Sequence, residues 1–270
     1  MSPVRRVAAF LRLLSQNGYM IRSLVVLELR KRYVGSLLGV FWSVVHPLIQ
    51  LLIYYFVFSV VLQMRLGAEY AGTNYAIWLI AGLLPWMMFA EVLTRSADAV
   101  REQAAVIKKM VFPSEVLPIV KVGAAVVTHL IGLCLVLGLL AVVGEGISWR
   151  AILIVPYLVV VALLALGISW ALAASNVYLR DIGHVVGAFV NIWFFITPIV
   201  YAPTLVPKSL QGLYALNPMI YAVEGYRAAL LGRAGFDAYG FVYLGMFALL
   251  AFAIGGGVFR RLKPQFADVL

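Results

Sequence analysis

Six long apolar stretches, each with few or no charged residues, dominate the 270-residue sequence. A helix needs ~20 mostly apolar residues to cross ~30 Å of hydrocarbon. Hydrophobic residues make up 64% of the chain and charged residues only 12%, a composition that excludes a soluble enzyme, a disordered chain and a disulfide scaffold. We therefore expect an all-α polytopic membrane protein with six transmembrane helices in one domain, over residues 37–64, 75–95, 117–144, 151–178, 183–203 and 238–260.

The distribution of Arg and Lys predicts how these spans are oriented. Basic residues are concentrated in residues 1–33, after the last span, and in the connection that follows the second span and includes Lys121. By the positive-inside rule both termini should lie in the cytoplasm, which an even number of crossings allows. A cytoplasmic bias also explains the net charge of +10, so we expect membrane lipids and no nucleic acid as partners.

Residues 1–33 are expected to lie on the cytoplasmic surface of the membrane. Apolar residues recur at helical spacing from Val4 to Leu11, with arginines opposite them, which indicates an amphipathic interface helix. A solvated tail is the alternative. Residues 23–33 indicate a second surface helix leading into the first span, in which Glu28 can pair with Arg32 four residues later.

The connection between the fifth and sixth spans, residues 204–234, is too long and too apolar for a simple loop. Pro207 and Pro218 divide it into pieces that are too short to cross a bilayer, because proline interrupts helices. Non-helical backbone at membrane depth is tolerated where protein or water covers it. We expect short re-entrant helices on the outer side; an amphipathic surface loop is the alternative.

Residues that could support catalysis are scarce in the apolar stretches. His46, His129 and His184 occur singly, without partners at metal-ligand spacing, so a hydrogen-bonded structural role is expected for each and no metal site is assigned. Glu91 and Arg95 are spaced to neutralise each other at the cytoplasmic end of the second span. A P-loop is also absent from the printed sequence, so ATP-driven transport would need a separate subunit. We expect a transport permease and not an enzyme, with no cofactor on this chain.

Aromatic residues occur inside the spans as well as at their ends. Aromatic faces can stack on the apolar faces of sugar rings, although packing between helices is the alternative role for each of them. The rings expected to line a substrate passage are Trp42, Tyr54, Tyr55, Trp86, Phe189, Trp193 and Phe194.

Six short blocks, taken together, resemble the membrane subunits of polysaccharide and polyol-phosphate ABC exporters, the group that exports O-antigen chains and teichoic acids. They are RYVGSLLGVFW at 32–42, GLLPW at 82–86, KKMVFP at 108–113, NVYLRD at 176–181, TPIVY at 197–201 and NP at 217–218.

This resemblance implies a homodimeric permease in the bacterial inner membrane, paired with two copies of a P-loop ATPase that binds ATP and Mg. The implied substrate is a lipid-linked polysaccharide, most closely of O-antigen type, with teichoic acid or capsular polysaccharide as alternatives. From the residues alone, a gradient-driven secondary transporter is a further alternative. The resemblance also implies a coupling helix within residues 98–113.

Three groups of site residues accompany these expectations. The ATPase-coupling group is Lys108, Lys109, Phe112, Pro113, Arg180 and Asp181. A gate for substrate entering from the cytoplasmic side is expected at Arg30, Arg32 and Tyr33. An outer gate is expected at Pro198, Tyr201 and Pro218.

Overall fold

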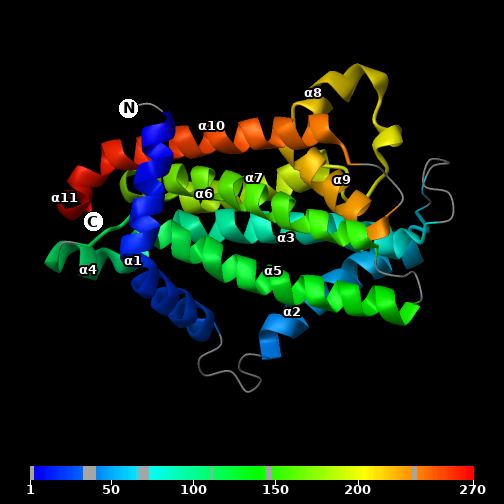
Figure 1. Ribbon diagram of the computed structural model, residues 1–270, viewed down its shortest axis with the longest axis horizontal. Helices are drawn as coiled ribbons and strands as arrows, with labels where there is room; N and C mark the ends of the chain where they lie inside the picture. The colour runs from blue at the N-terminus through cyan, green and yellow to red at the C-terminus, as the bar shows by residue number, and fades with distance from the viewer. Residues whose placement is uncertain are drawn as a thin grey trace.

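The computed structural model describes residues 3–32, 41–64, 66, 73–110, 112–143, 148–232 and 236–270, and within those ranges every regular element is a helix. Long helices run along the long axis of the molecule, and α1 crosses them at one end (Figure 1). The longer elements are α1 (Pro3–Lys31), α2 (Trp42–Tyr54) continued by a π-helix (Tyr55–Val61), α3 (Tyr75–Ala97), α5 (Val116–Val143), α6 (Ile154–Tyr178), α7 (Ile182–Ile196), α9 (Pro218–Leu231) and α10 (Ala238–Leu262). The shorter α-helices are α4 (Ala104–Lys109), α8 (Gln211–Ala215) and α11 (Phe266–Val269).

Among the described residues, five helical stretches are long and apolar enough to cross a membrane. They are Val44–Val61, Tyr75–Ala97, Val116–Val142, Trp149–Tyr178 and Ala238–Val269. The chain is thus an all-helical membrane protein. Residues 37–40 of the expected first span and residue 144 of the expected third span lie outside the described residues.

The helix found where the fifth span was expected is shorter than predicted. Helix α7 has 15 residues and ends at Ile196, whereas the apolar stretch suggested a span over residues 183–203. Thr197 has extended backbone angles (φ −88°, ψ 134°), because the following Pro198 disfavours the helical conformation at the residue before it. The six-span count is therefore not established by the helices alone.

Side-chain caps set where several of the helices begin. The Asn217 side chain accepts a hydrogen bond from the Met219 backbone amide (3.0 Å), and Pro218 occupies the first turn of α9, where a missing N–H costs nothing. Asn74 caps α3 and Asp237 caps α10 in the same way. The Asn-Pro pair therefore starts a well-formed helix in the connection between α7 and α10.

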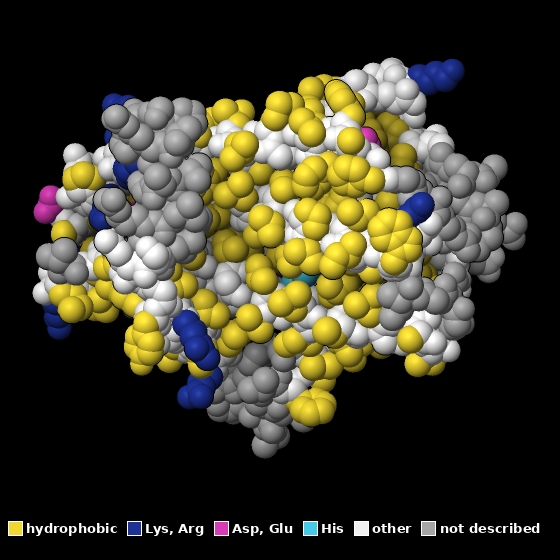
Figure 2. All heavy atoms as spheres, in the orientation of Figure 1, with side chains coloured by type: hydrophobic (Ala, Val, Ile, Leu, Met, Phe, Trp, Pro, Cys, Tyr) yellow, Lys and Arg dark blue, Asp and Glu magenta, His cyan; other side chains and the backbone are white. Residues whose placement is uncertain are grey.

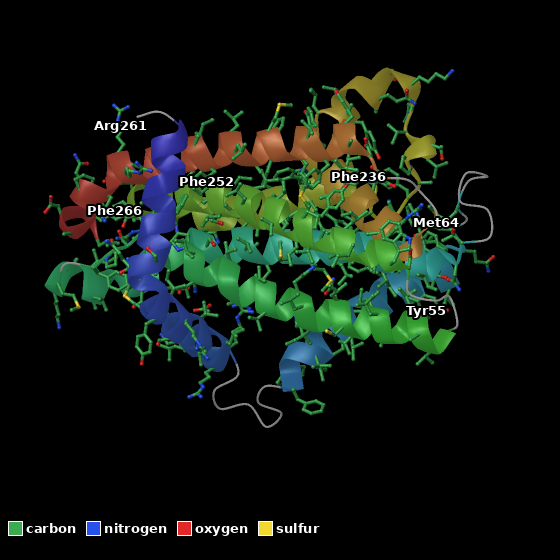
Figure 3. The ribbon with its side chains drawn as sticks, in the orientation of Figure 1. Tyr55, Met64, Phe236, Phe252, Arg261 and Phe266 are labelled. Atoms are coloured by element: carbon green, nitrogen blue, oxygen red, sulfur yellow. The ribbon has the colours of Figure 1, made fainter. Side chains whose placement is uncertain are left out.

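Helix α3 lies at the centre of the fold. In the most apolar part of α3, 78% of the residues are buried inside the molecule, whereas in the stretch from Val44 to Val61 the buried share is only 11%. Helix α10 lies along α6, and midway along α10 the ring of Phe252 packs on Trp170 with 5.1 Å between centroids (Figure 3). The two backbones approach so closely there that a Cβ added to Gly255 would lie 1.7 Å from the carbonyl oxygen of Gly167. Small residues permit such contact between membrane helices.

Both chain termini lie at the same end of the molecule as α4 and α11, whereas α8 and α9 lie at the opposite end (Figure 1). On the face shown in Figure 2, hydrophobic side chains cover the middle, and most Lys and Arg side chains gather over α1 and the end that carries α4. The N-terminal residues expected to form two separate surface helices instead form the single 29-residue helix α1.

Candidate transport site

A cavity of about 780 Å³ lies between α2, α3, α5 and α7. Its aromatic lining is contributed by Trp42, Tyr54, Trp86, Phe194 and Phe195. Its polar and charged lining is contributed by Arg32, His46, Gln50, Glu91, Thr94, Arg95, Thr128, His129 and Asn191. Rings and hydrogen-bonding groups thus share one cavity, a combination suited to a ligand with both apolar faces and polar edges.

The rings of the lining form a continuous contact across three helices. Tyr54 of α2 packs on Phe194 of α7 with 5.3 Å between centroids, and Phe194 packs on Trp86 of α3 at 5.8 Å. Each contact is tilted, as aromatic pairs prefer. Because the three rings belong to three helices, a relative movement of α2, α3 or α7 changes the shape of the cavity.

Four of the seven rings expected along a passage line this cavity, and three do not. Tyr55 and Phe189 are exposed on the outside of the molecule. Trp193 packs against Phe89 at 5.1 Å, and its indole N–H donates to the Asn217 side-chain oxygen (2.9 Å), so it ties α7 to the start of α9.

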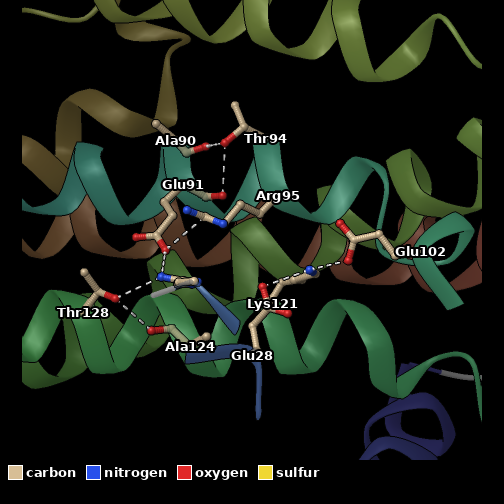
Figure 4. A network of polar contacts seen from close by, with 10 residues as sticks. Glu28, Ala90, Glu91, Thr94, Arg95, Glu102, Lys121, Ala124 and Thr128 are labelled. Atoms are coloured by element: carbon tan, nitrogen blue, oxygen red, sulfur yellow. Dashed lines mark hydrogen bonds and ion pairs between the residues drawn. The ribbon is translucent and has the colours of Figure 1, made fainter. Parts of the chain in front are cut away.

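Arg32, expected at the cytoplasmic-side gate, lines the cavity and is buried. Its guanidinium forms an ion pair with Glu91 and donates to the Thr128 hydroxyl (3.2 Å) (Figure 4). Arg95 completes the expected i,i+4 pair with Glu91, with 3.6 Å between Nε and Oε1. Of the other two residues expected at this gate, Arg30 is exposed and Tyr33 lies outside the described residues.

Glu28 does not form the pair with Arg32 that its spacing suggested. It accepts a hydrogen bond from the Lys121 ammonium (2.9 Å), which also donates to Glu102 (2.7 Å) (Figure 4). Lys121 is buried and belongs to α5, although the sequence placed it among the basic residues between two spans. Contacts with other helices have therefore replaced the local pair.

The residues expected to contact an ATPase lie at the end of the molecule that carries α4. Lys108 and Lys109 end α4 and are exposed, and Arg180 and Asp181 are exposed in the turn between α6 and α7. Phe112 and Pro113 are half-buried after α4, and Phe112 packs against the hydrophobic core.

The fully buried Asn176 holds the turn after α3 against the start of α7. Its side-chain amide donates to the Ala97 carbonyl (3.0 Å) and to the Asp98 carboxylate (2.8 Å), and its oxygen accepts from the Gly183 amide (3.3 Å). The turn after α3 and the turn before α7 are thereby joined by one side chain.

At the opposite end, Arg227 of α9 organises the non-helical segment that follows α7. It donates to the carbonyls of Pro198 (2.9 Å) and Ile199 (2.8 Å), and its guanidinium carbon lies 3.3 Å from the centroid of a Trp78 ring. Buried carbonyls without helical partners need such donors. Arg227 therefore fixes the shape of this segment.

All three residues expected at an outer gate lie around this segment. The carbonyl of Pro198 is held by Arg227, and the Tyr201 hydroxyl donates to the Phe195 carbonyl (2.9 Å). Pro218 is buried in the first turn of α9. The Asn217 amide, next to it, donates to the Thr197 hydroxyl (2.9 Å).

Three buried polar residues were not predicted as structural contacts from the sequence: Lys121 contributed only to the distribution of charge, and no role was expected for Arg227 or Asn176. The sequence did contain one signal for such contacts: a charged side chain within an apolar helix is energetically costly unless it has a partner. His129 fits its expected structural role, since its ring nitrogen lies 3.0 Å from the Tyr226 hydroxyl in the buried core. Within the described ranges, no group of three or more His, Cys, Asp or Glu side chains could hold a metal ion.

These features define a class: a polytopic helical membrane protein with an amphipathic cavity between its helices and charged side chains exposed at one end. Comparison with known proteins identifies the family. Residues 19–231 match the model of the ABC-2 type transporter family, and the chain belongs to that family.

Curated relatives match along almost their whole length. The chain is 30% identical over 261 residues to the O-antigen export system permease protein RfbA of Myxococcus xanthus, covering 94% of this chain and 96% of that protein. It is also 30% identical over 258 residues, with the same coverage, to the protein of that name from Klebsiella pneumoniae. The polysialic acid transport protein KpsM of Escherichia coli is 22% identical over 245 residues, covering 89% of this chain and 92% of that protein.

Proposed function

We propose that the chain is the membrane subunit of an ATP-driven exporter that moves a lipid-linked polysaccharide of O-antigen type from the cytoplasmic to the outer side of the bacterial inner membrane. The observation that carries the proposal is the cavity of about 780 Å³, which is lined by aromatic rings and by charged and hydroxyl-bearing side chains. Stacking on rings suits sugars and tolerates movement along a chain, because it depends little on which sugar is present. The names of the relatives support the same substrate class.

ATP and Mg would bind to a separate P-loop subunit, present in two copies. Exposed side chains at the ends of α4 and α6, namely Lys108, Lys109, Arg180 and Asp181, would form the docking surface. Because Asn176 links the turn after α3, which leads toward α4, to the start of α7, a subunit docked on these side chains would act on both segments together. A second copy of this chain would complete the transporter.

The proposed topology places α1 in the cytoplasmic interface and both termini in the cytoplasm. It includes six crossings, with α7 as the short fifth. At ~1.5 Å per residue its 15 residues span ~22 Å, less than the ~30 Å of hydrocarbon. The segment after Ile196 and the largely buried helix α9 would complete the outer half of this crossing as re-entrant structure covered by protein, whereas the exposed helix α8 would lie at the outer surface.

In this transporter the glycan would enter near Arg32 and α1 and then pass the rings of Trp42, Tyr54, Trp86 and Phe194. It would leave through the segment that Arg227 holds against α3. Its lipid carrier would stay close to the exposed apolar surface of α2, where Leu52 and Ile53 are more than half exposed.

The first test is affinity purification of the tagged chain in mild detergent from its native host, with mass spectrometry of co-purifying proteins. We expect a stoichiometric P-loop ATPase whose hydrolysis rate changes when lipid-linked glycan is added. Recovery of a lone chain after crosslinking in the membrane, with transport that follows an ion gradient, would refute the proposal in favour of a secondary transporter. Competing lipid-linked glycans of O-antigen, teichoic acid and capsular type would identify the cargo.

The docking surface is tested by the double substitution Lys108→Glu and Lys109→Glu. Both lysines are exposed, so the variant should fold normally, yet reversal of two charges should abolish co-purification of the ATPase. The matched control is Lys208→Glu in the turn that leads into α8, which lies at the opposite end of the molecule (Figure 1); it should have no effect. Normal ATPase recovery and export by the double variant would contradict the assignment of α4.

A further inference from the structure

One buried ammonium joins α1 to the segment that leads into α4. Lys121, whose side chain is 8% exposed, lies 2.9 Å from the Glu28 carboxylate of α1 and 2.7 Å from the Glu102 carboxylate. Glu102 belongs to a 3-10 turn, Arg101–Gln103, which runs directly into α4. We refer to Glu28, Lys121 and Glu102 as the Lys121 bridge.

Beyond Glu28, the Lys121 bridge continues to the cavity. Glu28 and Arg32 are four residues apart, so they follow each other along one face at the end of α1. Arg32 lines the cavity and pairs with Glu91, which lines it too. Polar contacts therefore lead from the base of α4 through Lys121 to Glu28, and the end of α1 connects Glu28 to Arg32 at the cavity.

The electrostatics of the bridge give it two distinct arrangements. Two carboxylates share one ammonium, and a hydrogen bond to Lys121 is lost when its partner withdraws by ~1 Å beyond the usual 2.7–3.2 Å. If α4 moves and carries Glu102 away, the ammonium is attracted by Glu28 alone and shifts toward it, so that Glu28 and the end of α1 change position; when α4 returns, the ammonium is shared again. Coupling between distant sites needs an element with discrete states of this kind.

We infer that Lys121 is a positioning residue that conveys displacement of α4 to α1, and through α1 to Arg32 at the cavity. This inference rests on the proposed function, since it requires a motor subunit that moves α4. It assigns α1 a second role besides lying in the interface: α1 changes position with each ATP cycle, and its Arg32 end reshapes the cytoplasmic mouth of the cavity.

Distance measurements by electron paramagnetic resonance on the purified complex with its ATPase test this directly. Cys134 is exposed and is first replaced by serine. Nitroxide labels at the exposed positions Ser23 on α1 and Ala105 on α4 are each measured, in separate samples, against a label at Val142 on the far end of α5. Spectra are recorded without nucleotide and with ATP plus vanadate.

In the otherwise unchanged chain, ATP and vanadate should shift both distances. In the Lys121→Met variant the Ala105 distance should still shift, while the Ser23 shift is lost; Lys121→Arg, which keeps the charge and the donors, should restore it. Glu102→Gln should act like Lys121→Met. Because Glu102 is about half exposed, this variant should fold even if Lys121→Met does not.

Two matched controls separate the bridge from general loss of ion pairs. Lys263→Met removes another strong pair, with Glu115 at 2.6 Å, and Arg101→Gln removes the pair with Asp98 beside the bridge. Both variants should keep both shifts.

Equal Ser23 shifts with and without Lys121 would overturn the inference, as would loss of the Ala105 shift in Lys121→Met. If the unchanged chain shows no shift at Ala105, the proposed function itself fails; a shift at Ala105 without one at Ser23 refutes the bridge alone.

Discussion

Replacing Arg227 with methionine should destabilise the protein far more than replacing any exposed arginine. Arg227 is 2% exposed and is a donor to the carbonyls of Pro198 and Ile199, which lie in non-helical backbone. Methionine fills much of the same volume but donates no hydrogen bond. The substitution therefore isolates the polar contacts from the packing.

The magnitude follows from the groups that lose their partner. A buried acceptor left unsatisfied costs ~1–3 kcal/mol, so the two carbonyls together cost ~2–6 kcal/mol. The Glu224 carboxylate (2.7 Å) and the Trp78 carbonyl (3.3 Å) also lose a donor, but Glu224 is one-third exposed and the Trp78 contact is long, so both contribute less. Loss of a desolvated cation over the Trp78 ring adds up to ~2 kcal/mol. Release of the buried charge offsets part of this, because burial of an ion is itself unfavourable. We expect a net loss of ~3–5 kcal/mol in the free energy of unfolding.

Unfolding by SDS in mixed micelles, followed by tryptophan fluorescence, measures this loss. The control is Arg150→Met, which removes a half-buried arginine that donates to the Gly232 carbonyl (2.9 Å), with an expected cost of ~1 kcal/mol. Arg227→Lys should fall between the wild type and Arg227→Met, because one ammonium cannot reproduce the planar fork of the guanidinium. Equal losses for Arg227→Met and Arg150→Met would refute the reasoning.

Two further predictions concern packing and the passage. Gly255→Ala should lower the free energy of unfolding by at least ~1–3 kcal/mol, because the new methyl group would collide with Gly167. Gly257→Ala on the same helix is the control; its methyl group meets no atom within 4 Å, so it should be neutral or slightly stabilising. Equal melting temperatures for the two variants would contradict the close contact. Phe194→Leu should slow glycan export about two- to tenfold, which corresponds to the loss of one ring contact of ~0.5–1.5 kcal/mol. Phe189 lies outside the cavity, so Phe189→Leu should not slow export. Equal export rates for the two variants, in vesicles that hold the same amount of folded protein, would count against the passage.

The sequence was sufficient for those features that depend on local pattern. Hydropathy predicts membrane helices because the bilayer imposes one requirement, apolar length, and the helices from Tyr75 and from Ala238 begin at or next to the expected residues. The short helix after Asn217-Pro218 was likewise predictable, since an Asn cap and a first-turn proline act within three residues. The Glu91–Arg95 pair is local in the same sense.

Features that depend on distant partners were not predictable from one sequence. The partners of Lys121 are 93 and 19 positions away, so nothing in the local pattern distinguished it from a surface lysine. Trp193 was expected in the passage, but its partner Asn217 draws it toward α9. The early end of α7 is different, because Pro198 was visible in the sequence. Hydropathy alone does not register the effect of proline on the preceding residue.

The contact between Gly167 and Gly255 also bears on how the chain assembles during synthesis. Helix α10 is made after α6, and the whole of α7, α8 and α9 is made between them. Lipid offers no hydrophobic preference for one neighbour over another, so a late helix needs a steric cue to find its place. Sliding α10 by one turn along α6 would set the side chain of Phe259 against the Gly167 carbonyl, where there is no room for a Cβ. The contact between Gly167 and Gly255 thus selects the register in which α10 packs against α6.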